Sequence, residues 1–249
     1  MSSEKYRDIE MKHIKSLLFP IAIIAVLLPG CDGLAITLDE AITAASLIEE
    51  HFDAEDYQLP SKYEMTLRMD TTSQSHVASQ IIGETYDREE KYLYWSLSYS
   101  TDDIAMFSES WMYYEASEGI TYLVMEQEGE KYHDTVSGDY FTSTIENTNL
   151  HLHSFCTSLS LSQALAEIRD GTYDNDSRNV YRSSGEGSLY CKLYVTIDGA
   201  ANTTEIRISD YQLVEMSIHD GEGRTLVIAV EYLDVSTDKP NLSDYPPAS

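Results

Sequence analysis

Alternating apolar and polar positions predict that most of this chain is β-strand. Between Tyr63 and Asp70 every second residue is apolar, and a period of two places those side chains on one buried face of a sheet. Similar patterns predict further strands at residues 76–86, 91–100, 111–114, 120–127, 190–197, 204–208, 213–218 and 225–232. Because short polar or glycine-containing turns separate these segments, we expect neighbouring strands to pair antiparallel.

Two segments instead have the spacing of an amphipathic helix. Thr37 and Glu40 fit a capping box, and apolar residues recur at helical spacing from Ala41 to Phe52. A second helical pattern covers residues 159–168, whereas residues 131–150 follow no regular period. The order of helix, strands, helix and strands predicts a mainly β fold of the α+β class, with one sheet and packed helices.

The N-terminal segment has the pattern of an export signal. A basic stretch around Lys12 and Lys15 precedes a 12-residue apolar run, Leu17 to Leu28. A membrane-spanning helix needs about 20 such residues, so the run is too short to be an anchor helix. We therefore expect residues 1–30 to be a signal peptide, with Met11 as an alternative start because residues 1–10 are polar.

The end of this segment, Leu28-Pro29-Gly30-Cys31, resembles the lipobox of bacterial lipoproteins. In that family the cysteine thiol receives a diacylglycerol and the leader is cut just before it. The resemblance implies that Cys31 is lipidated, that residues 31–36 are a tether, and that the protein is anchored to the membrane outside the cytoplasm. An ordinary secretory signal followed by a free cysteine is the alternative.

We expect a single domain over residues 37–235, since a β-rich chain of this length can bury one core. Residues 236–249 contain Pro240, Pro246 and Pro247, which predicts an extended C-terminal tail. Tyrosine is abundant, with 19 copies in the chain, and favours half-buried pleated surfaces.

The charge of the chain excludes one class of partner. Its 43 Asp and Glu against 16 Lys and Arg give a net charge of −27, which repels phosphates, so a nucleic-acid partner is excluded.

Apart from Cys31, the chain contains Cys156 and Cys191. An exported protein can join them in a disulfide, and two buried free thiols are the alternative.

Motifs that would indicate an enzyme or a metal site are weak. His151 and His153 would share one face if their segment were a strand, but two ligands are too few for structural zinc. Residues 174–176 resemble the start of a calcium loop without its later ligands, and we interpret them as a polar loop. With no Gly-x-Ser-x-Gly or His-Glu-x-x-His motif, we predict neither catalysis, nor a metal, nor a cofactor.

The strand and turn pattern near the C-terminus carries a family resemblance. Residues 205–209, 213–223 and 225–232 form a succession of strand, turn, strand, glycine-containing hairpin and strand. Together with the lipobox, this order resembles the LolA/LppX/LprG-like fold of envelope lipoproteins. The resemblance implies a curved antiparallel half-barrel sheet, with helices on its concave face and a hydrophobic cavity between them.

Six alternating apolar residues are the candidate lining of that cavity; they are Met65, Leu67, Met69, Leu93, Trp95 and Leu97. Relatives in this family use the cavity for acyl chains, which implies a non-enzymatic carrier or sensor of an apolar ligand in the cell envelope. If the six residues fill a dry core instead, we expect an interaction or scaffold lipoprotein that has no small-molecule ligand.

Overall fold

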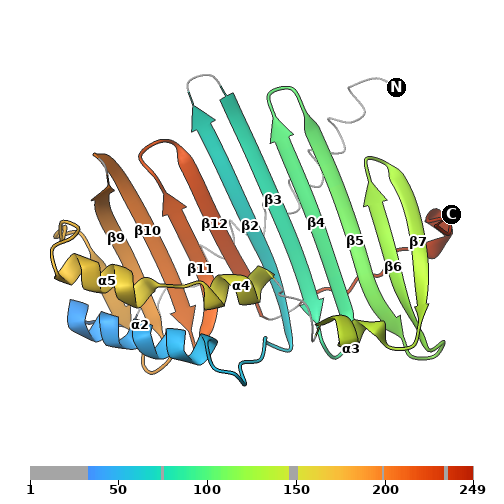
Figure 1. Ribbon diagram of the computed structural model, residues 1–249, viewed down its shortest axis with the longest axis horizontal. Helices are drawn as coiled ribbons and strands as arrows, with labels where there is room; N and C mark the ends of the chain where they lie inside the picture. The colour runs from blue at the N-terminus through green and yellow to red at the C-terminus, as the bar shows by residue number, and fades with distance from the viewer. Residues whose placement is uncertain (1–32, 74–75, 146–150, 198, 233–234, 249) are drawn as a thin grey trace.

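The protein forms one open antiparallel sheet with helices on one side (Figure 1). The computed structural model describes residues 33–73, 76–145, 151–197, 199–232 and 235–248. The sheet has 12 strands in the order β1-β8-β9-β10-β11-β12-β2-β3-β4-β5-β6-β7. Since β1 and β7 lie at opposite edges, the sheet is not closed into a barrel.

The strand bounds are β1 (Leu34–Ala35), β2 (Lys62–Ser73), β3 (His76–Asp87), β4 (Tyr92–Thr101), β5 (Ala105–Glu115), β6 (Ile120–Gln127), β7 (Glu130–Ser137), β8 (Val180–Ser183), β9 (Leu189–Ile197), β10 (Ala200–Ser209), β11 (Gln212–His219) and β12 (Arg224–Glu231). The helices are α2 (Leu38–Phe52), α3 (Tyr140–Ile145), α4 (His151–Thr157), α5 (Leu161–Arg169) and the 3-10 turn η1 (Leu242–Asp244). The mainly β, α+β class predicted from the sequence is confirmed.

The first helix begins where the sequence predicts. Thr37 Oγ1 accepts a hydrogen bond from the backbone N–H of Glu40 at 3.3 Å, and Glu40 Oε2 accepts one from the backbone N–H of Thr37 at 2.8 Å. This reciprocal capping box satisfies two amide groups that no helical carbonyl could reach. α5 also forms close to its predicted range, after Ser160 as its N-cap residue.

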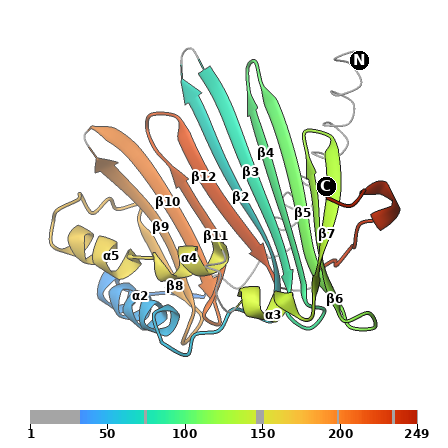
Figure 2. The same cartoon turned by 45° about the vertical axis from the view of Figure 1, so that its right-hand side comes forward.

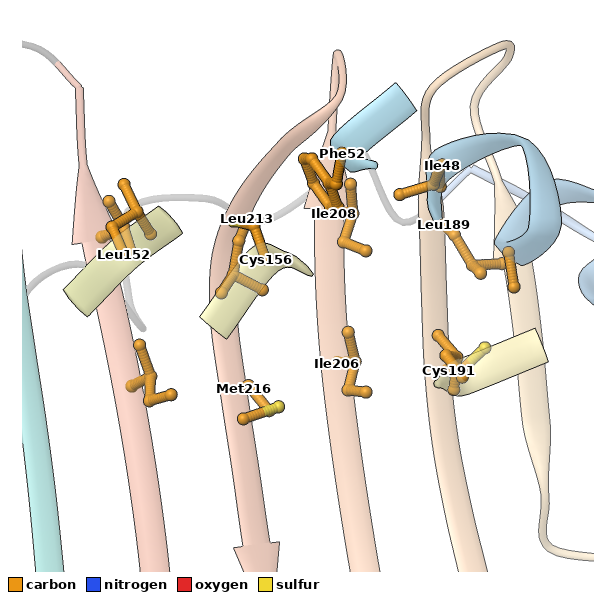
Figure 3. Close-up of a cluster of buried hydrophobic side chains, with 14 of the residues drawn as sticks. Ile48, Phe52, Leu152, Cys156, Leu189, Cys191, Ile206, Ile208, Leu213 and Met216 are labelled. Carbon is orange, nitrogen blue, oxygen red and sulfur yellow. The ribbon is translucent and has the colours of Figure 1, made fainter. Parts of the chain in front are cut away.

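One face of the sheet carries the helices, and we call it the helix face. α2 packs against α4, α5, β8 and β9, and the four buried residues of α2 are Ala41, Ala45, Ile48 and Phe52. Figure 3 shows Ile48 and Phe52 beside Leu189, Ile208 and Leu213 of β9, β10 and β11. The core therefore lies between these helices and the half of the sheet that runs from β8 to β2.

Over β3 to β7 the helix face has much less cover (Figure 2). There α3 contacts β5, and Phe141 stacks on Tyr86 with ring centroids 6.2 Å apart. Lys91, just before β4, forms an ion pair with Asp139, just before α3. α3 is thereby held at one end of these strands.

The opposite face, which we call the tail face, has its own aromatic cluster. Tyr92, Tyr113 and Val124 are buried there together with Tyr245 of the C-terminal segment, residues 235–248. Neighbouring side chains along a strand point to opposite faces. Tyr92 and Tyr113 therefore lie on the tail face, and their neighbours Leu93 and Met112 lie on the helix face. Around these residues, β4 and β5 therefore carry apolar or aromatic side chains on both faces.

Some regular elements were missed from the sequence. Residues 131–150, which have no clear period, contain most of β7 and all of α3. Residues 151–157 form α4, and the short strands β8 and β1 at one edge of the sheet were not predicted. Short elements bury only a few side chains, so their periodicity is too brief to identify.

Candidate apolar ligand surface

Cross-strand pairing places all six candidate lining residues on the helix face. Partners that lie directly opposite each other in an antiparallel pair share a face. Leu67 pairs with Ile82, which pairs with Leu97. The same rule groups the remaining candidates, because Met65 and Trp95 both pair with Glu84, Met69 lies two residues beyond Leu67 and Leu93 two residues before Trp95.

The helices divide these six residues into two groups. Met65 and Leu67 are 0% and 4% exposed and belong to the packed core. Leu93 is half-buried against that core, and Trp95 and Leu97 are half-buried farther along the same strand. Met69 is 38% exposed. The apolar surface thus continues from the packed core onto the more exposed parts of β2 and β4.

This continuation forms an open surface of seven partly exposed apolar side chains; they are Met69, Ile82, Trp95, Leu97, Met112, Leu123 and Met125. Their strands, β2 to β6, are consecutive neighbours in the sheet. Ser108 and Ser110 of β5 share the face, because they pair with Leu97 and Trp95. A group of neighbouring, partly exposed apolar side chains is typical of a surface that binds a ligand, a membrane or another protein.

A buried polar pair lies at the border between the core and the open surface. Tyr63 Oη donates a hydrogen bond to Glu84 Oε1 at 2.6 Å, and Glu84 is only 2% exposed. Burial, together with the nearby Glu84 carboxylate, raises the pKa of Tyr63, so its hydroxyl keeps its proton. Glu84 pairs with Trp95 across the strands, which places a carboxylate directly beside the open surface.

A separate hollow of about 520 Å³ lies where α2 begins and α5 ends. Its walls include Thr37, Leu38, Ile168, Arg169 and Tyr173, and none of the six candidate residues lines it. Arg169 Nη1 lies 3.9 Å from Asp39 Oδ1 at its rim, and both side chains are exposed. We assign no chemistry to this hollow, because its charged groups form ordinary surface pairs.

The two cysteines are free thiols in this structure (Figure 3). Cys156 is on α4 and Cys191 is on β9, and both are buried in the core. Burial raises the pKa of the Cys156 thiol to about 11 and that of Cys191 to about 12. Neither cysteine is therefore a thiolate nucleophile at neutral pH.

The burial of the thiols gives a direct prediction. In the native protein at pH 8, we expect neither Cys156 nor Cys191 to react with a thiol reagent over minutes, because both are buried and protonated. After unfolding in guanidinium, both should react at once, and counting modified thiols by mass spectrometry measures this. If denatured, unreduced protein gave no modification of these two residues, a disulfide would join them instead.

The other candidate motifs fall in ordinary structural roles. The strand that would align His151 with His153 does not form, since both belong to α4, where residues two apart do not share a face. Asp176 accepts hydrogen bonds from the backbone and side chain of Arg178, which lowers its pKa to about 2. Over the described ranges, no three His, Cys, Asp or Glu residues are placed to hold a metal ion.

The remaining findings concern membrane-spanning helices and the comparison of this chain with known proteins. None of the helices in the described part of the chain is both long and apolar enough to span a membrane. Cys31 and the lipobox-like segment lie outside the described residues. No family model matches the chain, and the search among curated proteins finds no relative.

Sequence reasoning missed that the tail face is covered, although a signal was present. At residues 92–95 every position is aromatic or apolar, since Tyr92 and Tyr94 alternate with Leu93 and Trp95. A strand covered on one face only should have one polar phase. The doubled pattern indicates that something covers the second face, and the C-terminal segment does so.

Proposed function

We propose that this protein is a membrane-anchored, extracytoplasmic lipoprotein that binds an apolar, acyl-chain ligand without catalysis. The helix face would be the concave side of a LolA-like half-barrel, and the ligand would lie along the open surface. The lipid on Cys31 would hold the domain at the membrane from which such a ligand comes.

The observation that carries the proposal is the continuation of the apolar core onto β2 to β6. Seven apolar side chains there are partly exposed on one face. Three of them, Met69, Met112 and Met125, are methionines, whose unbranched side chains adapt to ligands of varied shape. Ser108 and Ser110 offer hydroxyls at the same face for a polar headgroup.

The first test is native mass spectrometry of the chain from Asp32 onward, purified from a bacterial host and followed by solvent extraction. We expect an added mass that disappears on extraction and is recovered as an acyl-chain lipid. A ligand-free mass, together with no uptake of added fatty acid or phospholipid, would overturn the proposal in favour of a scaffold lipoprotein without a small-molecule ligand.

A charge placed in the open surface should weaken ligand binding. We expect Leu97→Lys to reduce the affinity for a fluorescent fatty-acid probe about tenfold or more, because an apolar ligand would have to cover an ammonium group. The matched control is Leu47→Lys on α2, where Leu47 is 50% exposed and outside the core. Equal affinities for both variants would place the probe elsewhere on the protein.

A further inference from the structure

The C-terminal segment occupies an aromatic site on the tail face. Tyr245 is its anchor, with only 6% of its surface exposed. The ring of Tyr245 meets that of Trp111 edge-on, with centroids 5.9 Å apart and planes at 73°, and Lys131 Nζ lies 5.0 Å from the Tyr245 centroid. Leu242, three residues earlier, packs against the same cluster.

The backbone of the segment also pairs with the edge strand β7. The His133 N–H donates to the carbonyl of Pro246 at 3.0 Å, and the Ala248 N–H donates to the carbonyl of His133 at 2.8 Å. His133 Nδ1 makes a further contact with the carbonyl of Tyr245 at 2.6 Å. The segment thus adds a short parallel bridge to the sheet, which is how many proteins bind extended peptides.

Two carboxylates at this site, those of Glu115 and Glu126, are each paired with a lysine. Lys239 Nζ lies 3.3 Å from Glu115 Oε2 and 5.1 Å from the centroid of the Tyr113 ring. Glu126 accepts hydrogen bonds from Tyr245 Oη at 3.3 Å and is paired with Lys131. The segment supplies one cation but two acids, Asp238 and Asp244, to a surface of a chain whose net charge is −27.

We propose that the tail face over β4 to β7 is a binding site for an extended, basic segment of a partner protein that carries a tyrosine followed by proline. The C-terminal segment is its internal occupant. The aromatic anchor and the edge pairing need only a tyrosine and an extended backbone, which another chain can supply. Glu115 already takes a lysine from the segment, and the net charge of −27 favours further lysine or arginine where this chain has Asp238 and Asp244. This site is independent of the open surface, which lies on the other face.

A partner peptide can bind this site only when it displaces the C-terminal segment. A tethered segment acts at an effective concentration of about millimolar, so an external peptide binds the intact chain poorly. A basic partner displaces the segment where its concentration and its better charge complementarity together outweigh this tethering. The C-terminal segment therefore makes the site selective for partners that bind more strongly than the tail does.

The experiment uses fluorescence anisotropy with three labelled 14-residue peptides against a chain that ends at residue 235. The first peptide has the sequence of residues 236–249, the second carries Asp238→Lys and Asp244→Lys, and the third carries Tyr245→Ala. We expect the first to bind and the second to bind about three- to tenfold more tightly at low salt. The third should not bind measurably, and the intact chain should bind the first about a hundredfold more weakly.

Controls keep the test decisive if the shortened chain does not fold. The full chain with Tyr245→Ala loses only the anchor, and it should bind the first peptide more tightly than the unchanged chain does. Adding Trp111→Ala to that variant should abolish the gain. The proposal fails if the Tyr245→Ala peptide binds as well as the first one, or if the basic peptide gains nothing. Concentration-dependent dimers that vanish with the tail would identify a second copy, not a basic partner, as the occupant and would overturn it as well.

Discussion

Replacing Phe52 with alanine is expected to lower the free energy of unfolding by about 3–5 kcal/mol, because it removes a large buried ring and leaves a cavity. Phe52 is 1% exposed, and its ring meets that of Tyr57 edge-on with centroids 5.6 Å apart. Domains typically have only about 5–15 kcal/mol of stability, so this loss is a large share of the total. Urea unfolding followed by tryptophan fluorescence, with its transition midpoint, measures it.

The matched control for this variant is Leu47→Ala on the same helix. Leu47 is 50% exposed, so its truncation should change the unfolding free energy by no more than about 0.5 kcal/mol. Both changes leave a good helix former in α2, so helix propensity cannot account for a difference between them. Similar losses for both variants would show that α2 does not pack on the sheet through the face described above.

How much of this fold the sequence could predict depends on the length of each element. β2 to β4 have 10 to 12 residues each, so several consecutive alternations are visible and all three were found. α2 has both a cap and a long apolar stripe, and its prediction was correct. α3 and α4 have only six and seven residues, and they were missed.

The candidate surface shows a second limit. Alternation identified which side chains share the helix face, because the period of two is a local property. The alternation could not predict that Met65 is buried and Met69 exposed, because the exposure of each residue depends on where helices distant in the sequence pack on the sheet. Met65 is 0% exposed and belongs to the core cluster that includes residues of α2, α4 and α5, whereas Met69 is 38% exposed and lies outside that cluster.

The tail face shows why a composition rich in tyrosine supports more than one interpretation. Tyr92, Tyr94, Tyr113 and Tyr122 pack in or against one cluster with Tyr245. Burial and the nearby Glu126 raise the pKa of Tyr245 to about 12, so its hydroxyl stays protonated and donates to that carboxylate. The abundance of tyrosine thus reflects a second packed cluster on the tail face as well as the half-buried surface of the sheet.

Replacing Cys31 with serine is expected to abolish lipid attachment completely, which is the largest effect predicted for any functional variant. The thioether to diacylglycerol requires the sulfur, and a hydroxyl at this position does not accept the lipid in the lipobox family that the segment resembles. Each buried CH₂ contributes about 0.8 kcal/mol to membrane binding, and a single chain binds only marginally. Incorporation of labelled palmitate in a bacterial host, followed by mass analysis of the N-terminus, measures attachment.

The matched control is Cys156→Ser, which removes a buried thiol on α4 and leaves the lipobox-like segment intact. It should retain full palmitate labelling even if it lowers stability, whereas Cys31→Ser should fall to background. Membrane fractionation alone is a weaker measurement, because it reports membrane association and not the bond between the protein and the lipid. Labelling that persists in Cys31→Ser, or a mature N-terminus elsewhere, would show that the segment is an ordinary secretory signal. The ligand and peptide sites would then belong to a secreted protein, because both are built from residues of the folded domain alone.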